Sequence, residues 1–150
     1  MTIDWVCKHH SDLGKEQLYA ILRLRAEVFV VEQKCTYQDL DEQDLDGDTC
    51  HLMGWDGDRL VAYLRLLDPT SQGGDVVIGR VIVAPPARGT GLGHELLSQG
   101  LKQAEKHWPE ISIYLSAQAH LQAYYARYGF VVAGEEYLED DIPHIGMRRA

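Results

Sequence analysis

The stretch VVIGRVIVAPPARGTGLGHELLSQGL, residues 76–101, decides how this chain folds. It begins with an apolar run typical of a strand, stops at Pro85-Pro86, passes through a glycine-rich loop and continues with apolar residues at helical spacing. The apolar positions of the expected helix form one stripe: Leu92, Leu96, Leu97, Leu101, Ala104 and Trp108, with Gly100 on the same face. The stretch therefore predicts a strand, a loop and an amphipathic helix in succession.

The glycine-rich loop is suited to an anionic phosphate, because the first backbone N–H groups of a helix are unpaired and carry partial positive charge. A tight bend between strand and helix would also explain the glycines. Two common phosphate motifs fail on spacing. A dinucleotide fingerprint starting at Gly91 would need glycine in place of Leu96, and a Walker loop would need Lys-Ser or Lys-Thr where His94-Glu95 follow Gly93.

Length and composition predict one globular domain over residues 1–150. No apolar run reaches the ~18–20 residues of a membrane span, and no basic and apolar leader stands at the N-terminus, so we expect no membrane partner and a cytoplasmic location. The net charge of −9 argues against a nucleic acid partner. The three cysteines (Cys7, Cys35 and Cys50) form no metal-binding pattern, so we expect reduced, structural thiols and no metal.

Residues Arg88-Gly89-Thr90-Gly91-Leu92-Gly93 follow the pattern R-x-x-G-x-G after an apolar strand. This resembles the acyl-CoA pyrophosphate loop of the GNAT (GCN5-related N-acetyltransferase) superfamily. Further stretches are similar to its ElaA-type acyltransferase branch: LRAEVFVVEQ (24–33), AQAHLQ (117–122) and IPHIGM (142–147). The segment AYYARYGF (123–130) matches the general GNAT pattern. The resemblance covers essentially the whole chain.

Outside this stretch, periodicity and turn signals predict six further strands and two further helices. The strands are expected at Ile3–Lys8, His51–Trp55, Leu60–Leu67, Ile111–Ser116 and Ile142–Met147, with Phe130–Val132 starting another, and the helices at Lys15–Gln33 and Ala119–Tyr128. Asp56-Gly57-Asp58 is a hairpin turn signal.

Charged residues stand out at two places: the acidic run 39–48 and the apolar face of the first helix. The run Asp39–Asp48 fails as a calcium loop, since Met53 stands where the loop needs glutamate, and is interpreted as a solvated acidic loop. Arg25 and Glu32 lie on the core-facing stripe of the first helix. They either pair with other buried groups or border a cleft.

The resemblance implies an α/β (α+β) fold: a mixed, mostly antiparallel sheet with helices on both faces and a splayed central parallel strand pair. It implies acetyl-CoA as co-substrate, with pantetheine between strands Val76–Ala84 and Ile111–Ser116. The cofactor-binding residues it implies are Val81, Ile82, Val83, Arg88, Gly89, Thr90, Gly91, Leu92, Gly93, His94 and Gln118.

Transfer of an acetyl group to an amine needs an acid and a base. The resemblance places Tyr125 at the family's tyrosine, the acid that protonates the leaving thiolate, although a core aromatic is the alternative. The base candidates are Glu32, His51, His120 and His144, and the two last are favoured because they lie in segments that carry the resemblance.

Three functions remain open from the sequence. The first is an acetyl-CoA-dependent N-acyltransferase for an amine of a small molecule or peptide, with a homodimer allowed. The second is an acyl-CoA-binding sensor or interaction domain without useful turnover. The third is acyl transfer of the kind performed by acyl-homoserine-lactone synthases, which share this fold.

Overall fold

The computed structural model describes residues 2–34 and 38–150. The strands are β1 (Asp4–His9), β2 (Cys50–Asp56), β3 (Arg59–Leu67), β4 (Val76–Val83), β5 (Ile113–Gln118), β6 (Val131–Val132), β7 (Tyr137–Glu139) and β8 (Ile142–Arg149). The main helices are α1 (Lys15–Arg25), its π-helical continuation η2 (Ala26–Glu32), α2 (Leu92–His107) and α3 (Gln122–Ala126). Short 3-10 turns are η1 (His10–Asp12), η3 (Pro69–Ser71), η4 (Pro85–Ala87) and η5 (Ala119–Leu121).

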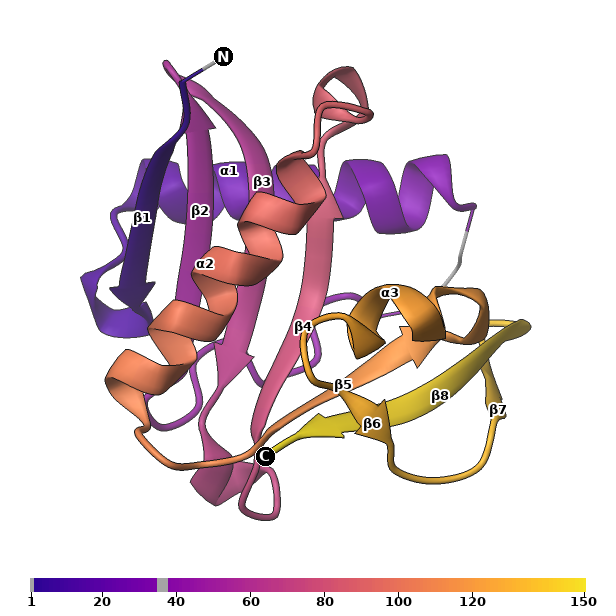
Figure 1. Ribbon diagram of the computed structural model, residues 1–150. Helices are drawn as coiled ribbons and strands as arrows, with labels where there is room; N and C mark the ends of the chain where they lie inside the picture. Colours follow the sequence, from indigo (N-terminus) through magenta and orange to yellow (C-terminus); the bar gives the residue numbers. More distant parts are fainter. Residues whose placement is uncertain (1, 35–37) are drawn as a thin grey trace.

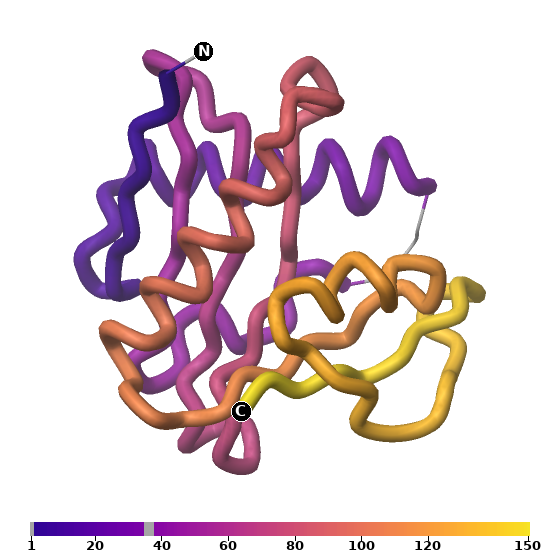
Figure 2. Tube along the Cα trace, viewed as in Figure 1, coloured from indigo at the N-terminus to yellow at the C-terminus, as the bar shows by residue number. Residues whose placement is uncertain are grey.

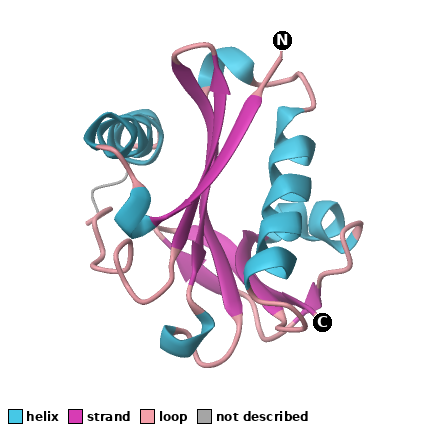
Figure 3. Ribbon diagram, turned by 90° about the vertical axis from the view of Figure 1, so that its left-hand side faces the viewer, coloured by secondary structure: helices cyan, strands magenta, loops and turns pink. Residues whose placement is uncertain are grey.

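The strands form one sheet in the order β1-β2-β3-β4-β5-β8-β6, and β7 pairs with β8 beside β6 (Figure 1). Every pairing is antiparallel except that of β4 with β5. The helix α1 covers one face of the sheet, while α2 and α3 cover the other (Figure 3). The expected α/β fold with a mostly antiparallel sheet is confirmed.

The helix α2 packs on the sheet through the stripe that the sequence predicts. Leu92, Leu96, Leu97, Gly100, Leu101 and Ala104 are all buried. Gly100 lets the helix approach β3 closely, because a Cβ there would lie 2.9 Å from Cδ2 of Leu64. This packing fixes the N-terminus of α2 relative to the end of β4.

The strands β4 and β5 are paired at only two positions, Val76 with Ile113 and Val77 with Tyr114. Beyond them β4 pairs only with β3 and β5 only with β8. The two traces diverge from these pairs (Figure 2). The splayed parallel pair is therefore present, and it leaves backbone groups on facing strand edges without a neighbouring strand.

A bulge in β4 accompanies this divergence. Tyr63 pairs with Ile82 and Arg65 with Gly79, so two residues, Arg80 and Val81, face Leu64 alone. Arg80 has a φ of 52°, a left-handed conformation that is strained for a side chain with a Cβ. Such a conformation persists only where the surrounding contacts hold it.

An ion cluster of three arginines and three aspartates supplies those contacts. Arg25 binds Asp39 and Asp44 (2.9 and 2.6 Å), and Arg65 binds Asp41 and Asp44 (2.6 and 3.1 Å). Arg80 binds Asp39 at 2.9 Å and Asp41 at 3.3 Å. The side chains of Asp39, Asp41 and Asp44 are 11, 22 and 13 % exposed. We refer to these six residues as the ion cluster.

The ion cluster bears on two predictions from the sequence, one for the acidic run 39–48 and one for Arg25. The acidic run 39–48 is not simply a solvated loop, because three of its carboxylates are enclosed by arginines from α1, β3 and β4. Arg25, which is fully buried, pairs with other buried groups as one of the two alternatives predicted.

Other differences from the sequence prediction are local. The first helix continues beyond Arg25 as the π-helical η2, and the strand β7 was not predicted. Cys7 and Cys50 are free thiols, whereas the prediction for Cys35 lies outside the described residues. Within residues 2–34 and 38–150, no helix is both long and apolar enough to cross a bilayer.

Arg25→Met should lower the free energy of unfolding by about 3–5 kcal/mol, because it leaves Asp39 and Asp44 enclosed without this cation. Urea denaturation at pH 7 measures the change. Arg23→Met, on an exposed position of the same helix, is the matched control and should stay within about 0.5 kcal/mol of wild type. Equal effects of the two substitutions would contradict a supporting role for the cluster.

Stability should fall in acid. Burial opposes the charge of Asp41, but the hydrogen bonds and charge of Arg65 outweigh burial and lower the pKa of Asp41 to about 2. The pKa of Asp44 is also lowered, mainly by its hydrogen bond to Arg25, against the effect of burial. The folded state binds these protons less readily than the unfolded state, so this contribution is complete above about pH 4 and is lost as the pH falls towards 2.

Urea unfolding of wild type and Asp41→Asn between pH 7 and pH 2.5 tests this dependence. The variant should be less stable at pH 7 and should lose less further stability in acid. Asp46→Asn, in the same acidic run and outside the ion cluster, should keep the dependence of wild type. A steep acid loss in Asp41→Asn equal to that of wild type would refute the assignment.

Candidate active site

A cavity of about 690 Å³ lies where β4 and β5 diverge. It is lined from one face of the sheet by Phe29 of η2 and from the other by α2 and α3. The lining residues used below are Val81, Val83, Gly93, Gln118, Tyr124, Tyr125, Arg80, Glu139, Asp140 and His144. Because both helical layers contribute, the cavity extends through the gap in the sheet. Two ligands could therefore enter it from opposite faces.

A second cavity, of about 580 Å³, lies between α1 and the hairpin of β2 and β3. None of the site residues predicted from the sequence lines it. The cavity at the splayed strands is therefore the candidate site.

The loop before α2 has the geometry of an anion site. Gly89 and Gly91 have φ values of 80° and 81°, and a Cβ at either position would meet nothing within 4 Å. Gly91 is the residue that precedes the first turn of α2, whose N–H groups have no partner within the helix. The space beside both glycines is thus open, and a phosphate could approach the backbone N–H groups of the loop directly.

Arg88 and Glu32 form a bidentate ion pair, with Nη1–Oε2 and Nη2–Oε1 distances of 2.9 and 2.8 Å. Nε of Arg88 also donates to the carbonyl oxygen of Val83 at 3.0 Å. The hydrogen bond from Arg88 lowers the pKa of Glu32. The arginine therefore ties the loop both to the end of β4 and to η2.

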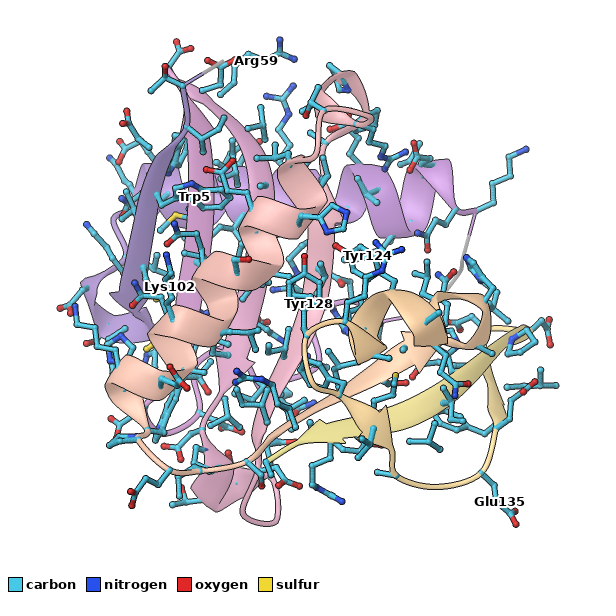
Figure 4. All side chains as sticks on the ribbon, viewed as in Figure 1. Trp5, Arg59, Lys102, Tyr124, Tyr128 and Glu135 are labelled. Atoms are coloured by element: carbon cyan, nitrogen blue, oxygen red, sulfur yellow. The ribbon has the colours of Figure 1, made fainter. Side chains whose placement is uncertain are left out.

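Aromatic contacts join α3 to the N-terminus of α2. Nδ1 of His94 lies 2.6 Å from the hydroxyl of Tyr128, and the ring of His94 lies 4.9 Å from that of Tyr124. Figure 4 shows Tyr124 and Tyr128 in the space between the two helices. Burial, with the neighbouring tyrosines, raises the pKa of Tyr124 to about 12. These contacts hold one wall of the cavity in place.

Tyr125 lines the cavity from α3. Its ring packs edge-on against Tyr124 and Phe130, at 5.1 and 6.1 Å between ring centres. Burial raises the pKa of the phenol, so it keeps its proton at neutral pH. Within the described chain no hydrogen bond from this hydroxyl is found, which leaves it able to donate to a ligand in the cavity.

His144 is 8 % exposed and lines the cavity from β8. Its Nδ1 lies 2.8 Å from the carbonyl oxygen of Ile142, and since a carbonyl only accepts, Nδ1 carries a proton. Its Nε2 lies 3.3 Å from a carboxylate oxygen of Glu139. In the neutral ring, Nε2 is therefore the atom that can accept a proton.

The structure places the other candidate bases away from the cavity lining. His120 is exposed on η5. His51 is buried between the hydroxyl of Tyr63 and the carbonyl oxygen of Asp44, at 2.6 and 2.9 Å, and burial lowers its pKa. The carboxylate of Glu32 is occupied by Arg88.

The predicted cofactor residues lie in three places: the cavity lining, the core, and the loop before α2 with the first turn of that helix. Val81, Val83, Gly93 and Gln118 line the cavity, whereas the side chain of Ile82 is buried in the core. The remaining ones, from Arg88 to Leu92 and His94, belong to the loop and the first turn of α2.

Three charged residues that line the cavity were not predicted as site residues from the sequence: Arg80, Glu139 and Asp140. Glu139 and Asp140 precede β8 at a turn in which Asp140 and Asp141 have positive φ. The run EEYLEDD, residues 135–141, held a signal in its charge, but nothing local to it indicates a cavity.

Comparison with known proteins fits this geometry. Residues 10–150 match the family model described as the acetyltransferase (GNAT) domain. The chain belongs to the GNAT family. Protein ElaA of Escherichia coli (strain K12) is 52 % identical over 147 residues, which cover 98 % of this chain and 96 % of ElaA. The chain is accordingly an ElaA-type member of the GNAT family and an acyltransferase.

Solved structures agree with this GNAT assignment. An acyl-CoA N-acyltransferase from Pseudomonas aeruginosa is 64 % identical, with a TM-score of 0.98 over 99 % of this chain and 100 % of that one. The crystal structure of Escherichia coli ElaA gives a TM-score of 0.94 at 51 % identity, over 99 and 100 % of the two chains. An aminoglycoside 6'-N-acetyltransferase complexed with coenzyme A shares the fold alone, with a TM-score of 0.71 at 15 % identity, over 96 % of each chain.

Proposed function

We propose that this GNAT protein transfers an acetyl group from acetyl-CoA to a primary amine. The observation that carries the proposal is the cavity through the splayed sheet, which has Tyr125 and the start of α2 on one side and His144 on another. Such a passage lets a thioester and an amine meet from opposite faces. The cytoplasmic location, the single domain and the homodimer remain predictions.

In this proposal the cofactor takes the place of a missing strand beside β4. Backbone groups of Val81, Ile82 and Val83 would pair with the amides of pantetheine, and one N–H would polarise the thioester carbonyl. The pyrophosphate would lie on the amides from Gly89 to His94, with Gln118 beside the pantetheine. The aminoglycoside acetyltransferase of the same fold is complexed with coenzyme A, which supports coenzyme A as the kind of ligand proposed here.

Arg88 acts in this proposal by holding the loop rather than by reaching the phosphate. Its guanidinium already binds Glu32 and the carbonyl oxygen of Val83. Glu32, predicted among the catalytic residues, would then serve as the partner that holds the guanidinium of Arg88 against η2.

Starting from an ammonium, the chemistry needs two protons removed from the acceptor nitrogen and one supplied to the leaving sulfur. Nε2 of His144 would take a proton from the acceptor ammonium, and the nitrogen lone pair would attack the thioester carbonyl carbon. As the tetrahedral intermediate collapses, the C–S bond breaks, Tyr125 would give its proton to the leaving thiolate, and the second proton of the attacking nitrogen would pass to the tyrosinate, which leaves a neutral amide and a neutral thiol. The buried phenol of Tyr125 and the position of His144 in the cavity lining support these roles, and His120 lies outside this route.

Calorimetric titration with acetyl-CoA, followed by a thiol-release assay with a panel of primary amines, tests the proposal. Wild type should bind acetyl-CoA and release thiol with some amine. Gly91→Glu should lower the affinity for acetyl-CoA at least tenfold, because the added carboxylate stands where the pyrophosphate would bind.

Gly73→Glu is the matched control for this titration. Gly73 also has a positive φ, 74°, and open space around it, but it lies in the loop before β4 and does not line the cavity. The control should keep the affinity of wild type. Binding without thiol release from any amine would favour an acyl-CoA sensor, and absence of binding would overturn the proposed function.

Tyr125→Phe should lower kcat at least tenfold while the affinity for acetyl-CoA and the melting temperature change little. The substitution removes the proton donor and keeps the ring contacts with Tyr124 and Phe130. Tyr19→Phe, on the exposed side of α1, is the control and should turn over like wild type. A Tyr125→Phe enzyme with the kcat of wild type would exclude the tyrosine as acid.

A further inference from the structure

We propose that Asp39 is a positioning residue for the acetyl transfer: it clamps the bulge of β4 to the start of η2 and so fixes the direction of the β4 backbone that faces the thioester. The inference rests on the proposed function, since it concerns the same cavity. It assigns a task in the reaction to a side chain that does not itself line the cavity.

Two arginines of the ion cluster hold Asp39 in the same way. Nε of Arg25 donates to Oδ2 of Asp39 at 2.9 Å, and its Nη2 donates to the carbonyl oxygen of Asp39 at 3.0 Å. Arg80 repeats both contacts, with Nε 2.9 Å from Oδ1 and Nη2 3.0 Å from the same carbonyl oxygen. Because both carboxylate oxygens and the backbone carbonyl are engaged, Asp39 fixes the two guanidinium groups relative to each other.

The two arginines belong to two different walls of the cavity. Arg25 is the last residue of α1 and directly precedes η2, whose Phe29 lines the cavity. Arg80 lies in the bulge of β4 and lines the cavity together with Val81. π-helical turns and bulges are frequent beside functional sites, where they direct particular groups towards a ligand. Asp39 therefore connects the two irregular elements that border the site.

The backbone of Arg80 depends on this clamp. Its φ of 52° is unfavourable for a residue with a Cβ, so we expect a released Arg80 to return to an extended conformation. The peptide between Arg80 and Val81 would then turn. The proposed function uses backbone groups from Val81 onwards to hold pantetheine and to polarise the thioester carbonyl. A change in their direction lowers kcat, because stabilisation of the transition state needs donors that are already aligned.

Two substitutions of Arg80 separate the role of the backbone from that of the guanidinium. Arg80→Ala and Arg80→Gly remove the same charged group, but glycine adopts a positive φ readily and alanine does not. Arg80→Ala should lower kcat by about tenfold or more, and Arg80→Gly should turn over at least about threefold faster than Arg80→Ala. Equal losses in the two variants, or no loss in either, would overturn the inference.

Asp39→Asn tests the clamp itself, because its amide nitrogen would oppose an arginine N–H on one side. Asp44→Asn is the matched control, since Asp44 is similarly buried and binds the two other arginines of the ion cluster. Thermal melting first establishes that both variants are folded at the assay temperature. Asp39→Asn should lower kcat by about tenfold, and Asp44→Asn should stay within about threefold of wild type. Equal losses in both would indicate general destabilisation and refute the positioning role.

Failure of the proposed function gives a different result. Wild type would then bind no acetyl-CoA or release no thiol, whereas the clamp can be measured without turnover. The NMR chemical shift of the Cα atom of residue 80 distinguishes a left-handed from an extended backbone. It should change in Asp39→Asn and stay at the wild-type value in Asp44→Asn. That result in a protein that releases no thiol would support the clamp and refute the acetyl transfer, and an unchanged shift in Asp39→Asn would overturn the inference.

Discussion

The ion cluster holds β4 in the bulged shape on which the cavity depends. Arg80 adopts a left-handed backbone conformation that costs of order 1–3 kcal/mol, and its guanidinium is fixed by Asp39 and Asp41. Arg25 and Arg65 anchor the same aspartates to α1 and β3. Without these ties β4 could relax towards a regular ladder with β3, and the backbone groups beside the splayed edge would no longer have their present directions.

Local sequence signals were sufficient for much of the fold. The stripe of α2 and the turn at Gly57 depend on spacing within a few residues, and both elements were predicted correctly. The family resemblance supplied the splay of β4 and β5, which spacing alone could not give. The ion cluster was missed because its arginines and aspartates lie 14 to 41 residues apart and meet only in the folded chain.

The candidate site shows the same limit. Tyr125, His144 and Gly93 were predicted and do line the cavity. The sequence could not show that Glu32 and Arg88, 56 residues apart, neutralise each other, or that the turn before β8 brings Glu139 within 3.3 Å of His144. Residue types were thus easier to predict than the partners that determine their charge and orientation.

The two residue pairs between β4 and β5 also have a consequence for how the molecule opens and closes. Long antiparallel ladders connect the strands within β1–β4, and another connects β5 with β8. Only two residue pairs, between β4 and β5, connect these two parts of the sheet. Cooperative units of folding tend to follow such boundaries, and each unit can exchange its amide protons at its own rate. We therefore expect β1–β4 and β5–β8 to behave as two cooperative units, with the cavity on the boundary between them. Local opening of the native state at this boundary breaks the fewest backbone hydrogen bonds of the sheet.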